Sequence, residues 1–141
     1  MENAVPIESL INEEDRIVYT CCRGEMGLDD FKVYMAEVWG HMRYYGYNEL
    51  FDASQGDWSN FDFSYLFTVA AEASKLGSLD PASRMAWLIK QGKQKELTDF
   101  YSTAKSVLPV NSRSLQAFYD RDEALQWLCE TKIQLQSISK R

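Results

Sequence analysis

The chain has 141 residues, of which 45% are hydrophobic and 26% are charged, values that are typical of a single globular domain. Its formal net charge of −6 argues against a general nucleic-acid-binding protein, because a basic surface supplies most of the affinity of such proteins. We therefore expect no nucleic-acid partner.

The N-terminus carries Glu2 and shows neither the basic region nor the apolar run of a signal peptide. No segment approaches the roughly 20 apolar residues that span a membrane. The three cysteines form no CxxC pair, so neither a zinc site nor a redox motif is predicted. These observations predict a cytoplasmic protein with no metal, no cofactor and no membrane span.

Strand-like and helix-like patterns alternate along the chain. The runs 5–11 and 16–23, separated by a polar turn, predict a β-hairpin. Apolar residues at steps of three and four predict a helix over 28–42. A short strand follows at 47–53, and a second helix has its apolar face within 63–73.

The second half continues this alternation. The apolar run 85–89 predicts a strand that is buried on both faces, and a third helix has its inner face over 97–108. A strand at 114–119 and a helix over 120–128 complete the order β-β-α-β-α-β-α-β-α. This order predicts one α/β domain over residues 1–131, with a mixed sheet and a polar C-terminal tail at 132–141.

Several segments resemble a known family. The opening EEDRIVYTCCRGEMGLDDF, the strand YNELFDASQGDW, the run SRMAWLIKQGKQKELTDFYSTAKSVLP and the ending LQAFYDRDEALQWL resemble SpoIIAA-like proteins. These form the STAS-like group, which is related to bacterial anti-sigma-factor antagonists. The resemblance covers roughly residues 7–128 and implies a single-domain mixed sheet flanked by helices.

The resemblance also implies a regulatory function. Antagonists of this type bind an anti-sigma kinase and are switched by phosphorylation of a serine in an Asp-Ser-Ser/Thr-Gly-Leu-like turn. This chain has FDASQGDWSNFDFSYL there, which leaves Ser54 and Ser59 as the nearest candidate phosphorylation sites. Other members of the group are suspected of holding apolar small molecules or lipids. The partners to expect are thus an anti-sigma-factor-like protein or a small apolar ligand.

Two loops are candidate binding sites. Asp52, Ser54, Asp57 and Trp58 follow the carboxyl end of a strand, where open α/β sheets commonly bind ligands. The alternative is a surface loop in which Trp58 covers the edge of the core.

The second loop contains Gly92 and Lys93 at the opening of the third helix, where free N–H groups and a lysine favour an anion. The alternative is an ordinary helix start. Both loops are expected at the same edge of the sheet. The only histidine, His41, fits a helix end better than a catalytic base.

The leading hypothesis is a non-enzymatic module that binds a protein or a small, partly apolar ligand at these loops. One alternative is a small hydrolase or lyase with Asp52 or Asp57 as general acid or base, which requires a buried carboxyl group of raised pKa. The other is a homodimer without a ligand.

Overall fold

The structure, a computed structural model, describes residues 6–76, 80–107 and 113–139. A five-stranded sheet has the order β1-β2-β4-β6-β7, with β1 antiparallel to β2 and all other neighbours parallel. These strands are β1 (Ile7–Asn12), β2 (Ile17–Cys22), β4 (Asn48–Asp52), β6 (Arg84–Leu88) and β7 (Ser114–Phe118). The predicted hairpin and the three predicted strands that follow it are confirmed.

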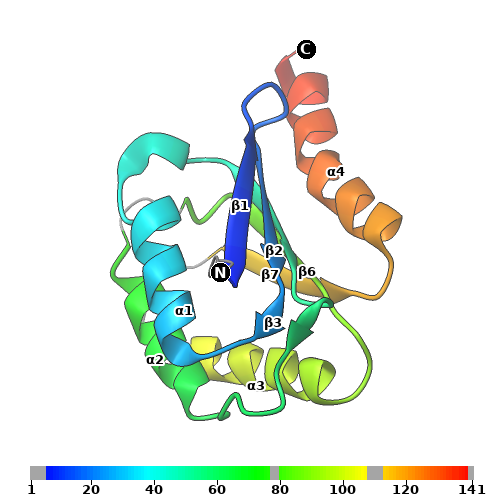
Figure 1. Cartoon of the computed structure of the whole chain (residues 1–141). Coiled ribbons are helices and arrows are strands. Elements are labelled where there is room, and N and C mark those ends of the chain that lie inside the picture. Colours follow the sequence, from blue (N-terminus) through cyan, green and yellow to red (C-terminus); the bar gives the residue numbers. More distant parts are fainter. Residues whose placement is uncertain (1–5, 77–79, 108–112, 140–141) are drawn as a thin grey trace, which may run out of the picture.

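Four α-helices flank this sheet unequally. They are α1 (Leu28–Tyr34), α2 (Tyr65–Ser74), α3 (Lys93–Val107) and α4 (Arg121–Ser139). Figure 1 shows α1, α2 and α3 on one side of the sheet, while α4 lies alone on the other. None of the described helices combines the length and apolar character that crossing a bilayer requires.

Two helical predictions need correction. The predicted helix over 28–42 is α-helical only to Tyr34 and continues as a π-helical segment, η1 (Met35–Trp39), followed by a short 3-10 helix, η2 (Met42–Tyr44). The last helix, predicted over 120–128, extends as α4 to Ser139 and so into the segment 132–141. No glycine or proline interrupts 121–139, so nothing in the local sequence stops α4 where its apolar pattern ends.

The sheet has a core on each face because side chains alternate along its strands. Val18, Phe51 and Trp87 point toward α1, α2 and α3 and belong to the larger core, which is rich in aromatic rings. Leu50 and Ala86 point the other way and form a smaller core with α4.

A second, very small sheet lies beside the carboxyl ends of β2 and β4. It pairs β3 (Gly24–Glu25) with β5 (Gly56–Asp57) in parallel. An added Cβ at Gly56 would lie 2.8 Å from the Trp58 indole nitrogen and 3.2 Å from Met26 Cγ. The close approach of these chains therefore requires glycine at position 56.

Helix α4 is anchored to the sheet by a buried amide. The Asn48 side chain donates to the Leu128 carbonyl oxygen at 3.1 Å, and its oxygen accepts from the Arg84 backbone N–H at 2.8 Å. Ala124 and Leu128 pack against the sheet and are fully buried. The helix is thus held over β4 and β6, away from β1.

Candidate functional site

Three polar side chains form a row across the sheet on the face that carries α4. Glu8 of β1 pairs with Cys21 of β2, and Cys21 pairs with Asp52 of β4. Residues paired in register project from the same face of a sheet. Two carboxylates therefore flank one thiol.

The next row on this face is apolar. Leu10, Tyr19 and Leu50 are aligned by the same strand pairing. Leu50 is buried beneath α4, whereas Leu10 is 76% exposed. The guanidinium group of Arg121, from the first turn of α4, lies 5.8 Å from the centre of the Tyr19 ring.

These rows line a groove with a volume of about 360 Å³, which we call the hairpin groove. Its size lies within the range of small-molecule sites, which are roughly 300–1,000 Å³. It is lined by Pro6, Glu8, Leu10, Tyr19, Thr20, Cys21, Arg23, Leu50, Asp52, Gln55 and Arg121.

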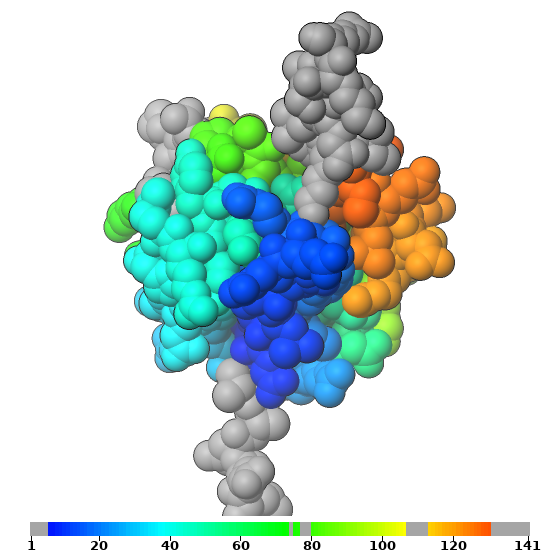
Figure 2. Space-filling model, turned by 90° about the horizontal axis from the view of Figure 1, so that it is seen from above, coloured from blue at the N-terminus to red at the C-terminus, as the bar shows by residue number. Residues whose placement is uncertain are grey.

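The groove exists because one helix is too narrow to cover five strands. An α-helix with its side chains is about 10 Å wide, whereas neighbouring strands are spaced by about 4.8 Å. Since α4 packs over β4, β6 and β7, none of the helices in the described residues lies above the same face of β1 and β2 (Figure 1). Figure 2 shows the blue hairpin at the surface, between the cyan segment after α1 and the orange start of α4.

Four charged side chains border the groove: Glu8, Asp52, Arg23 and Arg121. Within the described part of the chain, none of them forms an ion pair with another side chain. The Asp52 carboxylate is oriented by the backbone N–H of Ser54 at 2.9 Å and by the Ser54 hydroxyl, both of which donate to Oδ1. Of the predicted site residues, Asp52 therefore lines the groove, and Ser54 orients it.

The other predicted polar residues meet at a different place. The Lys93 ammonium group donates to the Ser59 carbonyl oxygen at 2.8 Å, which joins the start of α3 to the loop after β5. Asp57 is exposed and accepts from the Ser59 hydroxyl at 2.7 Å. Hydrogen bonds from the Ser59 hydroxyl and backbone N–H, and then the charge of Lys93, lower the pKa of Asp57. Gly92, with φ of +94°, makes the turn before Lys93.

Trp58 is part of the core. It is 6% exposed, packs against Phe31 and Phe61, and donates its indole N–H to the Ala53 carbonyl oxygen at 2.9 Å. The cavity beside it, near Gln94, has a volume of only about 10 Å³, about enough for one water molecule. The alternative in which Trp58 covers the core is therefore the one that the geometry supports.

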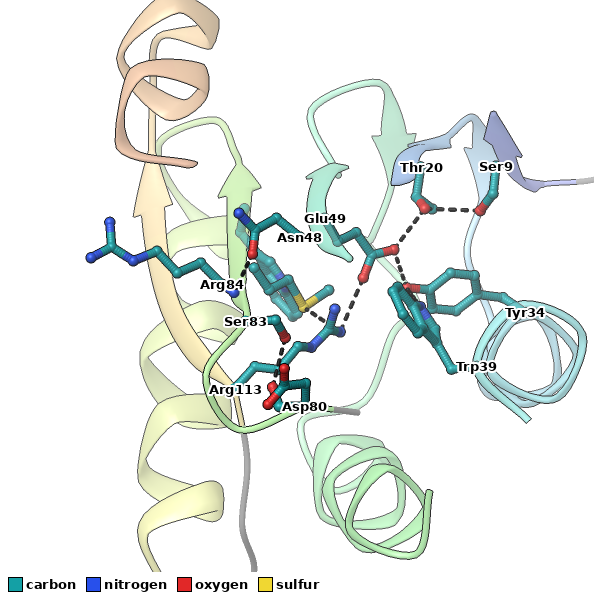
Figure 3. A network of polar contacts seen from close by, with 12 residues as sticks. Ser9, Thr20, Tyr34, Trp39, Asn48, Glu49, Asp80, Ser83, Arg84 and Arg113 are labelled. Carbon is teal, nitrogen blue, oxygen red and sulfur yellow. Dashed lines mark hydrogen bonds and ion pairs between the residues drawn. The ribbon is translucent and has the colours of Figure 1, made fainter. Parts of the chain in front are cut away.

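The larger core contains a buried polar network that the sequence does not reveal (Figure 3). Glu49 is 0% exposed and forms an ion pair with Arg113, which is 8% exposed, at 3.1 Å. The Tyr34 hydroxyl and the Thr20 hydroxyl both donate to the other carboxylate oxygen of Glu49. Because Thr20 donates there, its hydroxyl accepts the hydrogen bond from Ser9 at 2.8 Å.

Aromatic side chains enclose this network. The Trp39 indole N–H donates to the Tyr34 oxygen at 3.0 Å, and the Arg113 guanidinium lies 4.5 Å from a Trp39 ring centre. Burial, and then the charge of Glu49, hold the pKa of Tyr34 well above its usual value. The phenol therefore stays protonated and donates to Glu49.

A cavity of about 30 Å³ lies beside Arg113, between Trp39 and Tyr101. Nη1 of Arg113 is buried and has no hydrogen-bond partner within the described residues. This space suits one or two water molecules and is far below the size of a ligand site. The network thus ties α1, β2 and β4 to the start of β7, and the hairpin groove is the larger candidate site.

The remaining candidate groups are His41 and the three cysteines. His41 is exposed, and its ring accepts from the Arg43 backbone N–H at 3.3 Å, which begins η2. Cys22 is fully buried, and burial raises the pKa of its thiol, so it is a poor nucleophile. Cys21 is half-buried in the groove and Cys129 is exposed.

Comparison with known proteins supports the fold. No family model matches the chain, and no curated protein matches it. Among solved structures, it is similar to an uncharacterised protein of the DUF3478 family, with a SpoIIAA-like fold, from Shewanella loihica PV-4. The identity is 17%, the match covers 87% of this chain and 92% of that chain, and the TM-score is 0.54. At this identity the likeness establishes the fold alone. The chain has a SpoIIAA-like fold.

Proposed function

We propose that the protein is a non-enzymatic binding module that holds a small, partly apolar ligand in the hairpin groove. The observation that carries this proposal is the groove itself, which has the volume of a ligand site. The apolar row of Leu10, Tyr19 and Leu50 lies in it beside the polar row of Glu8, Cys21 and Asp52. Charged and polar side chains make up about as much of its wall as apolar ones, so the groove suits a ligand that carries polar groups beside an apolar body.

The carboxylates favour binding over catalysis. A general acid requires a carboxyl group whose pKa is raised by burial. Asp57 is exposed and its pKa is lowered, which is the reverse of this requirement. Asp52 is oriented by two hydrogen bonds from Ser54, an arrangement that suits the recognition of a ligand donor.

Ser54 connects this proposal with regulation. Its hydroxyl donates to Asp52, so a phosphate on Ser54 would place about two negative charges next to that carboxylate. Phosphorylation would then repel Asp52 and release a ligand held by it. Ser59 lies against Asp57 and Lys93 instead, and its modification leaves the groove unchanged.

Native mass spectrometry tests the proposal on freshly purified protein. We expect a bound mass that is lost on denaturation. The variant Cys21→Trp places an indole in the groove and removes this mass. The control Val33→Trp adds the same side chain at a 51% exposed position of α1 and leaves the bound mass in place. Circular dichroism confirms that both variants are folded.

Two outcomes contradict the proposal. A bound mass that persists in Cys21→Trp places the ligand outside the groove. A bare mass in the wild-type protein shows that no small ligand is retained, and a dimer in the same spectrum favours the homodimer. A protein partner is then sought by pull-down, with Arg23→Glu as the variant that disrupts the rim of the groove.

A further inference from the structure

The arrangement of charged side chains around the hairpin groove restricts the class of ligand that can bind there. The groove borders two carboxylates, Glu8 and Asp52, and two guanidinium groups, Arg23 and Arg121. None of these four is paired with a charged side chain within the described residues. A ligand that carries both signs is complementary to this balanced set.

The positions of these groups follow from strand β2. Tyr19 and Cys21 are two residues apart and project from one face, and Arg23 comes two residues after Cys21. Two residues of strand cover about 7 Å. Glu8 and Asp52 flank Cys21, whereas Arg121 lies over Tyr19. Positive charge thus lies on either side of the two carboxylates.

We propose that the groove selects a small zwitterion with a primary ammonium group, an apolar body and a carboxylate. The ammonium group binds between Glu8 and Asp52, the body lies on Leu10 and Tyr19, and the carboxylate meets Arg121. This inference rests on the proposed function of the groove. The termini of an extended dipeptide are separated by about 7 Å, so an apolar dipeptide matches the spacing and a free amino acid is shorter.

Ligands with one charge fit less well. A purely cationic ligand satisfies Glu8 and Asp52 but brings its charge toward two guanidinium groups. A purely anionic ligand meets the two carboxylates. Because each charge-assisted hydrogen bond typically contributes more than a neutral one, blocking either charge of the zwitterion is expected to weaken binding about tenfold or more.

Cys21 provides the readout because it lies between the two carboxylates and is half-buried. The wild-type protein is alkylated with iodoacetamide, and the rates at individual cysteines are followed by peptide mass spectrometry. L-leucyl-L-leucine is expected to slow alkylation of Cys21 at least threefold at saturation. Cys129 is exposed but lies near Tyr19, so the control is a free thiol such as N-acetylcysteine in the same reaction, and its rate should not change.

Two blocked probes test the need for both charges. N-acetyl-leucyl-leucine lacks the ammonium group, and leucyl-leucine amide lacks the carboxylate. Each is expected to require about ten times the concentration for half-maximal protection of Cys21. L-leucine, tested in parallel, distinguishes a free amino acid from a peptide as the source of the zwitterion.

A double variant assigns the ammonium site. In Glu8→Gln/Asp52→Asn, the advantage of the dipeptide over its N-acetyl form should disappear, while Arg121 still favours it over the amide. The matched control Asp57→Asn removes a carboxylate outside the groove and should leave all preferences unchanged.

Two results overturn this inference. One is equal protection by either blocked probe in the wild-type protein, and the other is no protection by any of the probes. The proposed function is judged separately by native mass spectrometry. A bound mass that is lost in Cys21→Trp retains the groove as a ligand site even if the zwitterion fails, whereas a bare mass rules out a retained ligand and leaves the zwitterion to be judged by the protection of Cys21.

Discussion

Glu49 and Arg113 form an ion pair in the aromatic core, where neither charge has more than slight access to water. Removing one charge leaves the other buried without compensation, which typically costs about 3–5 kcal/mol. We therefore expect Glu49→Gln to lower the free energy of unfolding by this amount. Urea denaturation followed by circular dichroism measures it.

The pair Lys95–Asp99 is the control because both side chains are largely exposed on α3. Asp99→Asn is expected to change the free energy of unfolding by less than about 1 kcal/mol. The double variant Glu49→Leu/Arg113→Met removes both buried charges and should recover much of the loss. A cost below about 1 kcal/mol for Glu49→Gln would show that the Arg113 site tolerates an unpaired charge.

Lys105 gives a second prediction at the residue scale. Burial, and then the positive charge of Arg113, lower the pKa of Lys105 to about 8, while its amine donates to the Arg113 carbonyl oxygen at 2.7 Å. Between pH 8 and about 10 the unfolded chain binds a proton that the folded protein lacks, so stability rises with pH. Relative to Lys105→Met, the wild-type protein should gain stability over this range in urea titrations. If the free energies of unfolding of the two proteins change with pH in parallel, the lowered pKa of Lys105 is contradicted.

The paired short strands β3 and β5 are the element most sensitive to side-chain size. A Cβ at Gly56 would meet the Trp58 indole at 2.8 Å, and that indole is held by the Ala53 carbonyl oxygen. Gly56→Ala is therefore expected to cost roughly 1–3 kcal/mol through overpacking. Thermal and urea unfolding measure the loss. In the control Gly27→Ala, the new Cβ meets only Asp30 Oδ2 at 3.4 Å, so the expected loss, about 1 kcal/mol or less, comes only from the poorer preference of alanine for the N-cap of α1. A larger loss there than in Gly56→Ala would remove the steric explanation.

The order of the main strands and helices was predictable because each has a run of five or more residues with its own periodicity. The short strands β3 and β5 were not, since two residues have no alternation. The π-helical turn of η1 was also missed, because the apolar spacing through Val38 fits an α-helix. Such turns depend on tertiary contacts, which here include the packing of Trp39 over Arg113.

The candidate site was only partly predictable. Asp52 was found because it ends a strand, a position defined by local sequence. The partners Glu8 and Arg121 come from distant segments, and only the strand register and the placement of α4 bring them to Asp52. One pattern in the sequence could have indicated the groove, namely the alternation of side chains along β1 and β2. This alternation places Glu8, Leu10, Tyr19 and Cys21 on one face. Glu49 gave no signal because Arg113 is 64 residues away.

In the part of the chain that the structure describes, β1 and β7 form the two edges of the main sheet and β4 forms its centre. The backbone hydrogen bonds of central strands usually open only when the whole protein unfolds, whereas those of edge strands open in local fluctuations. Amide hydrogen exchange, followed by mass spectrometry of peptides, should show the slowest exchange in β4 and β6. Strand β1 should exchange faster, because no strand among the described residues pairs with its outer edge and no described helix covers its groove face. Equal protection of β1 and β4 would indicate that another chain covers the hairpin.

The buried amide of Asn48 has a consequence for the evolution and redesign of α4. Its two polar atoms are used by two different elements, a carbonyl oxygen of α4 and a backbone N–H of β6. If the helix slipped by one residue, the amide would lose its acceptor while remaining enclosed. Asn48 therefore fixes both the rotation of α4 about its axis and its position along that axis. Apolar residues beneath the helix can be exchanged for others of similar volume, because the two hydrogen bonds of Asn48 keep α4 in place. The width of the groove beside α4 then stays constant.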